Sequence, residues 1–326
     1  MMKTIHVLSW GGGTQSTALM LLMLEGKVKD KDNNSIMPDY IIFADTGDEN
    51  EMIYSQIIKI SDYVKKTYDK EIIITKKTKI KKTDQEIVEM IKNGELNPKT
   101  ISSSPYADLY QEQLLFYRNE IERATIVPFY IVDRNTGELS KLPGRQCTID
   151  YKITQIHKEL RIRENVKRFD KKTILINTYI GFTTDEISRV KQSPTSYIKN
   201  IFPLVDLNMT KASCIEYVEK VLGFKPKSSA CNMCYALTFD RVYEIYSHDP
   251  KSWDKVLLLD DAMENYNHNR IRGDIYMFRW QAKIRKRLIN IDMEAMKKER
   301  DKYKQLSIFD ILEDEEQLAC MGGCFI

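Results

Sequence analysis

The segment 8–23 constrains this chain most, because it joins an apolar run to a helical run through three consecutive glycines. Residues 4–8 predict a short buried strand, and residues 14–24 predict a helix that is apolar nearly all round. Glycines let the backbone approach an anion closely, and a helix N-terminus offers unpaired N–H groups. Ser16 and Thr17 add hydroxyl donors. The segment therefore predicts a phosphate-binding loop, with a plain glycine turn before a core helix as the alternative.

Two familiar glycine-rich phosphate loops are excluded by the residues around this turn. The P-loop needs a lysine directly before its hydroxyl residue, and no lysine precedes Ser16 or Thr17. The dinucleotide fingerprint needs a third glycine where the helix packs against the strand, and that position is not glycine. The loop must belong to another class of phosphate site.

Short apolar runs and helical stretches alternate after the loop. Residues 40–44 and 71–75 predict strands, residues 52–66 a helix between them, and residues 173–180 a later strand. Parallel strands joined by helices give this alternation. We expect an α/β fold with a doubly wound parallel sheet and a helical C-terminal region.

The same pattern divides the chain into parts. We expect an α/β nucleotide-binding domain over 1–235, interrupted by an insertion at about 76–144 that we interpret as a lid beside the sheet. Within the insertion, two short runs around Asp133 to Gly137 predict a β-hairpin. A helical subdomain over 236–304 and a flexible tail over 305–326 complete the chain.

Three local signals lie between the later strand and the helical subdomain. Thr183 with Glu186 predicts a capping box at a helix start. Residues 202–207 predict a short strand or extended loop, and Thr210 predicts the cap of an amphipathic helix.

Composition limits the class of protein but not its partner. The 326 residues carry 50 Lys and Arg against 47 Asp and Glu, a net charge of +3 that argues neither for nor against nucleic acid. No run reaches the roughly 18 apolar residues of a membrane span. We expect a cytoplasmic protein with no membrane partner, whose six cysteines serve as thiols, metal ligands or redox groups rather than disulfides.

Several motifs together resemble one family. They are GGGTQST, IFADTGDE, RQCTIDYKITQI, IGFTTDEISR, FPLVDLNMT, SACNMC and a C-terminal QLSIFD followed by a cysteine pair. The chain resembles the phosphoadenosine-phosphosulfate-reductase-like family, of bacterial and phage type, within the PP-loop ATP pyrophosphatase (adenine nucleotide alpha-hydrolase-like) superfamily. Two positions depart from the S-G-G-x-D-S loop, with Gly11 in place of the serine and Gln15 in place of the aspartate.

The resemblance implies a site for ATP or phosphoadenylyl sulfate with Mg²⁺ at the carboxyl ends of the strands. Adenine is expected against Phe43 and Ala44, while Asp45 holds Mg²⁺ through water, contacts ribose, or only caps the following helix. Basic side chains expected near phosphate or sulfate, unless they are surface charges, are Arg145, Lys152 and Arg189. The residues expected to bind the nucleotide are Ser9, Gly11, Gly12, Gly13, Thr14, Gln15, Ser16, Phe43, Ala44, Asp45, Thr46, Gly47, Gly181 and Phe182.

The cysteines supply the second chemical signal. Cys231 and Cys234 form a C-x-x-C turn, which brings two thiolates to one centre as zinc and iron–sulfur sites require. The resemblance places Cys147 near the nucleotide, where it supplies a third ligand. The fourth ligand is a tail cysteine, a non-protein sulfur or an open position. We favour a [4Fe–4S] cluster, with Zn²⁺ or no metal as alternatives, and expect Cys214 to be a core thiol.

The tail pair, Cys320 and Cys324, is the candidate catalytic pair. Reductases of this family carry a nucleophilic cysteine on a mobile tail, but their E-C-G-x-H motif is absent here. The pair is therefore expected to act as a redox or persulfide carrier, or as a cluster ligand, with an inactive tail as the alternative.

The function favoured by these motifs is adenylation of a target for sulfur insertion. The target is expected to be tRNA or DNA, and a sulfur-donor or thioredoxin-like protein is the expected partner. The alternatives are thiol-dependent phosphoadenylyl-sulfate reduction and nucleotide binding without turnover. Basic residues around Trp280 form either a surface that binds nucleic acid or an ordinary solvent-exposed helix face. They are Arg279, Lys283, Arg285, Lys286 and Arg287.

Overall fold

The computed structural model describes residues 3–77, 108–142, 144–166, 174–266 and 271–303, together with the single residues Glu89 and Asn93. The expected catalytic cysteines, Cys320 and Cys324, lie outside the described residues, as does the tail 305–326.

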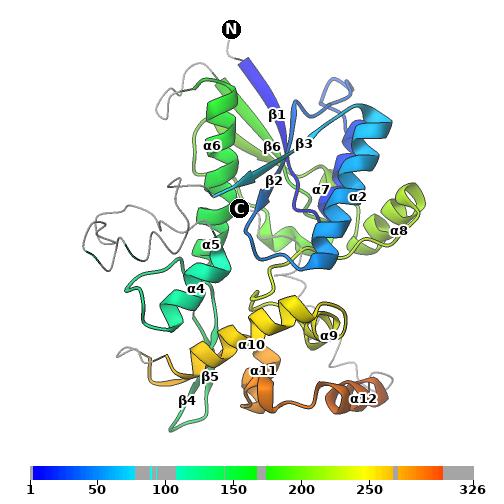
Figure 1. The fold of residues 1–326 in the computed structure, drawn as a ribbon. Helices are drawn as coiled ribbons and strands as arrows, with labels where there is room; N and C mark the ends of the chain where they lie inside the picture. Colours follow the sequence, from blue (N-terminus) through cyan, green and yellow to red (C-terminus); the bar gives the residue numbers. More distant parts are fainter. Residues whose placement is uncertain are drawn as a thin grey trace.

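A parallel sheet forms the centre of the N-terminal lobe (Figure 1). Its strands are β1 (Lys3–Ser9), β2 (Tyr40–Asp45), β3 (Ile72–Lys76), β6 (Ile174–Tyr179) and β7 (Ile198–Ile201). They lie in the order β3-β2-β1-β6-β7, and every pairing is parallel. The α/β prediction is confirmed, and β1, β2, β3 and β6 begin and end within about two residues of the predicted positions. Strand β7 was not predicted.

Helices cover both faces of this sheet, as a doubly wound fold requires. On one face, α1 (Thr14–Leu24), α2 (Glu51–Tyr68) and α8 (Lys211–Leu222) share a core that includes the fully buried thiol of Cys214. The opposite face packs against α6 (Thr154–Arg163) through Ile156 and Leu160. Figure 1 shows α6 and α2 on opposite sides of the strands.

Two of the three helices on the first face, α1 and α2, differ in sequence pattern because their surroundings differ. Every side chain of α1 is buried, which fits its nearly continuous apolar sequence. In contrast, α2 buries Ile53, Ile57, Ile60 and Val64 at helical spacing and exposes its charged side. Asn50 caps α2 by accepting a hydrogen bond from the N–H of Ile53, so Asp45 does not have the capping role considered as its alternative.

A second lobe contains helices around a small antiparallel sheet. Its helices are α4 (Leu109–Tyr117), α9 (Phe239–His248), α10 (Pro250–Glu264), α11 (Arg279–Ile284) and α12 (Met293–Tyr303). Its strands are β4 (Tyr130–Asp133), β5 (Leu139–Lys141) and β8 (Gly273–Tyr276), in the order β5-β4-β8. The predicted hairpin is confirmed as β4 and β5.

Strand β8 lies in the region expected to be helical. It pairs with β4 so closely that a Cβ on Gly273 would lie 2.4 Å from the carbonyl oxygen of Val132. One apolar core runs from Leu109 to Met293. The insertion and the C-terminal region therefore form one body, which the sequence pattern presents as two separate parts.

Short helical segments complete the described chain: α5 (Gln146–Thr148), the π-helical segment η1 (Ile149–Ile153), η2 (Thr184–Arg189), α7 (Pro203–Asp206) and η3 (Leu288–Asn290). The predicted helix start is confirmed, because η2 begins at Thr184 with Thr183 as its N-cap. The capping box is wrong, because the Thr183 side chain accepts no cap hydrogen bond and Glu186 pairs with Arg189. Residues 203–206 are a helical turn rather than a strand. The cap at Thr210 is confirmed, with Ser213 as its partner.

Among the helices in the described part of the chain, none is both long and apolar enough to cross a membrane.

A buried ion pair joins the two lobes. The side chain of Lys77, which follows β3, lies 3.7 Å from the carboxylate of Glu112 on α4, and both side chains are almost fully buried. Glu112 also accepts hydrogen bonds from the N–H of Thr125 at 2.7 Å and from the hydroxyl of Tyr151 at 2.5 Å. The Lys77 ammonium lies 4.0 Å from the centre of the Tyr151 ring. This carboxylate on α4 thus contacts Lys77 after β3, Thr125 in the loop after α4, and Tyr151 in η1.

We predict that Glu112→Leu destabilises the fold by about 3–5 kcal/mol, because it leaves the Lys77 charge buried without its carboxylate. Urea denaturation measures the free energy of unfolding. The exposed Glu120→Gln on the same segment is the control and should stay within about 0.5 kcal/mol of wild type. Equal stability of the two variants would contradict this role of the ion pair.

Candidate functional site

Three chain segments leave the sheet at the same edge. Strands β1, β2 and β6 run parallel, so the loops after Ser9, Asp45 and Tyr179 emerge together. The strand order reverses between β1 and β6, which makes this edge the topological switch point of the sheet. Doubly wound sheets bind their ligands at such points.

Side-chain hydroxyls fix the shape of the glycine loop. The Ser16 hydroxyl accepts a hydrogen bond from the N–H of Gly11 at 3.1 Å and donates one to the carbonyl of Gly13 at 3.2 Å. Thr17 donates to the same carbonyl at 2.7 Å. Gly12 has a φ of +72°, a conformation that favours glycine. The hydroxyls predicted to bind phosphate therefore hold the loop itself, and the backbone N–H groups at the start of α1 remain as its anion donors.

Gly181, at the end of β6, approaches the start of α1 very closely. A Cβ at this position would lie 2.8 Å from both the backbone nitrogen and the Cα of Ser16. Only glycine leaves room for this contact between the two loops. Phe182 follows and stacks on Phe202, with the guanidinium of Arg189 4.5 Å from the centre of the Phe182 ring.

Gln15, which replaces the aspartate of the PP-loop pattern, binds a carboxylate from another segment. Its amide donates to Glu186 at 3.3 Å. Glu186 pairs with Arg189, and all three side chains are buried. Burial raises the pKa of Glu186, an effect that the neighbouring Arg189 partly offsets. The structure thus brings a carboxylate to the helix start although the loop itself carries none.

A cavity of about 390 Å³ opens beside the switch point. Ser9 and Ile180 line it from the strand ends, Ile153 and His157 from η1 and α6, and Asn200 from β7. Burial lowers the pKa of His157 to about 4, so its imidazole is neutral at pH 7. A largely apolar cavity of this size with a few polar groups suits a nucleoside-sized ligand.

The side chains expected to contact adenine lie elsewhere. Phe43 packs against Trp10 in the core beneath α1 and α2, and Ala44 lies in the core on the opposite face, so neither lines this cavity. The carboxylate of Asp45 accepts hydrogen bonds from the N–H of Gly47 and from the hydroxyl of Tyr54, both at 2.8 Å. It therefore shapes the loop after β2 while remaining partly exposed.

The loop after β2 holds the C-x-x-C turn. The Thr46 hydroxyl lies 3.1 Å from the sulfur of Cys231, and Glu49 pairs with Cys231 as an isolated β-bridge. Asp48 accepts hydrogen bonds from Asn232 through its carbonyl at 2.8 Å and from Met233 through its carboxylate at 3.2 Å. Burial raises the pKa of Asp48 to about 8.

The structure brings the three expected metal ligands around one small cavity. Cys147, Cys231 and Cys234 line it together with Arg145 and Lys152. The ammonium of Lys152 lies 3.9 Å from the carboxylate of Glu49. Within the described residues, however, no group of three or more Cys, His, Asp or Glu side chains has an arrangement that could hold a metal ion.

The basic segment around α11 is only partly available to a nucleic acid. Trp280 is buried between Phe239 and Phe278, so it offers no face for base stacking. Arg287 pairs with Asp260 in the second lobe. The exposed cations of this segment are Lys283, Arg285 and Lys286.

Comparison with known proteins does not assign this site. None of the protein-family models searched matches the chain, and no curated protein matches it. Its interpretation therefore rests on residue chemistry and geometry.

Several residues of the site were missed by the sequence analysis. Gln56 lies three residues after Ile53 and four before Ile60, so helical spacing places it on the buried face of α2, where two loops cover it. His157 directly follows a quoted motif but has no spacing that indicates a ligand. The sequence contains a helical period for Gln56 but no sign of the loop that covers it.

We predict that Asp48→Asn removes the part of the pH dependence of the unfolding free energy that comes from the buried Asp48 carboxyl. Between about pH 4 and the folded pKa of about 8, the unfolded chain has released this proton and the folded chain keeps it, so stability falls as pH rises. The variant should therefore gain up to about 1.4 kcal/mol per pH unit relative to wild type across this window. Urea denaturation of both proteins at several pH values measures the difference, and a constant difference would contradict the prediction.

Proposed function

We propose that this chain binds ATP or a related adenine nucleotide as a PP-loop protein of the phosphoadenosine-phosphosulfate-reductase-like family. The phosphates lie on the glycine loop and the nucleoside lies in the cavity beside it. One observation carries this proposal: Ser9 lines the cavity and also begins the turn that leads into the glycine loop. A single ligand can therefore reach both.

The donors around the loop fit a polyphosphate. The N-terminal N–H groups of α1 carry partial positive charge toward the turn, which attracts an anion. Asp45, at the end of β2, is the residue that would hold Mg²⁺, directly or through water, since its carboxylate is partly exposed. Glu186 is a second carboxylate near the helix start.

The activity that best uses both the glycine loop and the cavity lined by cysteines is adenylation followed by sulfur transfer. An oxygen of the target attacks the α-phosphate and pyrophosphate leaves. The terminal sulfur of a cysteine persulfide on the sulfur-donor partner then attacks the adenylated atom, the bond to the AMP oxygen breaks, and AMP leaves. A second thiol attacks the remaining S–S bond, which releases the thiolated target and forms a disulfide. The loop N–H groups stabilise the charge that develops on the phosphates. The residues expected to hold a [4Fe–4S] cluster or Zn²⁺ are Cys147, Cys231 and Cys234, which line one cavity. Among the described residues they do not form a group arranged to hold a metal ion, so no step of the proposed reaction uses a metal at these thiols. The proposed acceptor is tRNA or DNA, with a sulfur-donor or thioredoxin-like partner.

One feature favours a second candidate. The neutral amide of Gln15 occupies the position at which the PP-loop pattern carries a carboxylate. This substitution suits reduction of phosphoadenylyl sulfate by a thiol, or nucleotide binding without turnover, because neither needs pyrophosphate to leave. In the reduction, the thiol attacks the sulfur, the adenine nucleotide leaves, and a second thiol releases sulfite as a disulfide forms.

Gly181→Ala should weaken ATP binding by about tenfold or more, because its methyl group would displace the start of α1. Calorimetric titration with Mg²⁺ and ATP measures the dissociation constant. The control is Gly223→Asn at the C-terminus of α8, where the backbone is left-handed, no atom lies within 4 Å of the added Cβ, and Asn is tolerated. Unchanged affinity in Gly181→Ala would argue against phosphate binding on this loop.

The two candidate reactions differ in their products. With Mg²⁺, ATP and tRNA or DNA, we expect pyrophosphate, and with phosphoadenylyl sulfate and a dithiol we expect no sulfite. Coupled-enzyme detection of pyrophosphate and a colorimetric sulfite assay distinguish them. Sulfite without pyrophosphate would overturn the adenylation proposal, and tight ATP binding without either product would favour the non-catalytic alternative.

A further inference from the structure

The segment 226–229 lies between the glycine loop and the C-x-x-C turn. The Thr14 hydroxyl donates to the carbonyl of Pro226 at 3.2 Å. At the other end, the backbone nitrogen of Ser229 lies 3.1 Å from the position that a Cβ on Gly13 would occupy. The segment therefore packs directly on the first turn of α1.

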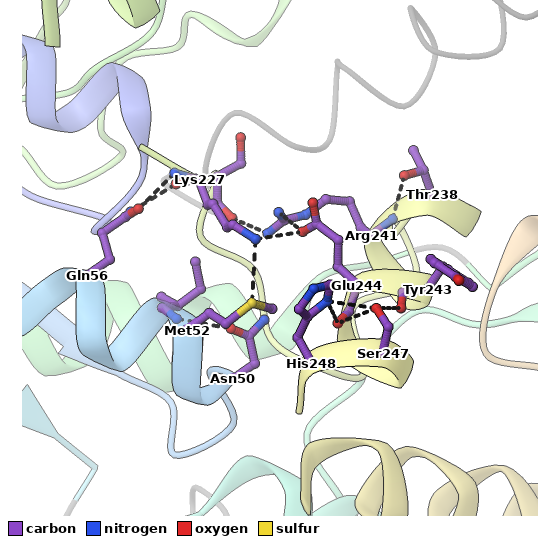
Figure 2. Close-up of polar contacts among 12 residues, drawn as sticks. Asn50, Met52, Gln56, Lys227, Thr238, Arg241, Tyr243, Glu244, Ser247 and His248 are labelled. Carbon is purple, nitrogen blue, oxygen red and sulfur yellow. Dashed lines mark hydrogen bonds and ion pairs between the residues drawn. The ribbon is translucent and has the colours of Figure 1, made fainter. Parts of the chain in front are cut away.

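Gln56 on α2 joins this segment to the glycine loop. Its amide nitrogen donates to the carbonyl of Gly12 at 2.8 Å and to the carbonyl of Lys227 at 3.0 Å. Its amide oxygen accepts from the N–H of Lys227 at 2.8 Å, and Figure 2 shows the Gln56–Lys227 contacts. Gln56 is only 6% exposed, so an apolar replacement would leave these backbone groups without their partner.

The second lobe holds the same segment from the opposite side. Arg241 on α9 donates to the carbonyl of Ser228 at 2.8 Å and pairs with Glu244 at 2.7 Å. The Lys227 ammonium contacts the same carboxylate at 3.3 Å and the sulfur of Met52 at 3.4 Å. Figure 2 shows Lys227 between α2 and α9, with Gln56 on one side and Arg241 and Glu244 on the other.

The segment continues into the thiol site after Ser229. The Ser229 hydroxyl donates to the carboxylate of Glu49 at 3.1 Å, and Glu49 pairs with Cys231. Thr46 lies 3.1 Å from the Cys231 sulfur. A short, hydrogen-bonded segment therefore connects the glycine loop to this thiol.

We propose that Gln56 is a positioning residue that couples occupancy of the glycine loop to the exposure and reactivity of the Cys231 thiol. Its amide makes the loop and the segment 226–229 move as one unit. The coupling deepens the proposed function and rests on it for the identity of the ligand.

The first test needs no nucleotide. Wild type, Gln56→Met and the control Gln281→Met are treated with iodoacetamide, and mass spectrometry follows alkylation of Cys231 and Cys214 separately. Gln281 is a fully buried glutamine that binds Asp260 within the second lobe. We expect Cys231 to react about fivefold or more faster in Gln56→Met than in the other two proteins. Equal rates would overturn the proposal.

Cys214 reports whether the variant stays folded, because it lies fully buried in the core beneath α8. It should remain unreactive in all three proteins. If it reacts in Gln56→Met, Arg241→Gln replaces that variant, since it removes the contact to Ser228 from the α9 side. The same acceleration of Cys231 is expected there, and its absence in a folded Arg241→Gln protein would also overturn the proposal.

The second test adds Mg²⁺ and ATP. With ATP at a concentration that direct titration shows to saturate each protein, the Cys231 alkylation rate should change by about fivefold in wild type and stay unchanged in Gln56→Met. An equal ATP effect in the two proteins would contradict the coupling. If titration shows no ATP binding to wild type, the proposed function fails, while the nucleotide-free comparison still decides the role of Gln56.

Discussion

Strand β1 is hydrogen-bonded to parallel neighbours on both sides, and this pairing positions the rest of the site. Because β2 and β6 run in the same direction as β1, their loops emerge at one edge and meet the glycine turn there. The pairing also brings Gly181 against Ser16, a contact that leaves no room for a side chain. Loops separated by about half of the chain thus become neighbours through the register of one strand.

The glycine turn is consequently a rigid element. Hydroxyls of α1 close it from inside, Gln56 binds it from α2, and the segment 226–229 packs over it. Preorganised N–H groups bind an anion without first ordering the loop, which preserves affinity. The same contacts tie the turn to Cys231 and place the glycine turn and the thiol site in one hydrogen-bonded unit.

Most of the first lobe could be predicted from sequence, because its strands and helices show their periods locally. The apolar runs of β1 and β2 and the spacing of isoleucines on α2 are examples. The second lobe could not be predicted in the same way. Strand β8 has only four residues, and its partner β4 lies far away in the chain, so no local pattern marks it. The capping box predicted at Thr183 does not form, because the Glu186 carboxylate pairs with Arg189 instead.

By itself, the sequence determined the parallel α/β architecture, the glycine turn and the cysteine motifs, since each depends on residues adjacent in the chain. Only the tertiary structure decided what these motifs contact. It directed Phe43 into the core, placed Cys147 beside Cys231, and covered Gln56 with a distant loop. Such contacts join residues far apart in sequence, and they arise from the packing of whole elements, which no local period encodes.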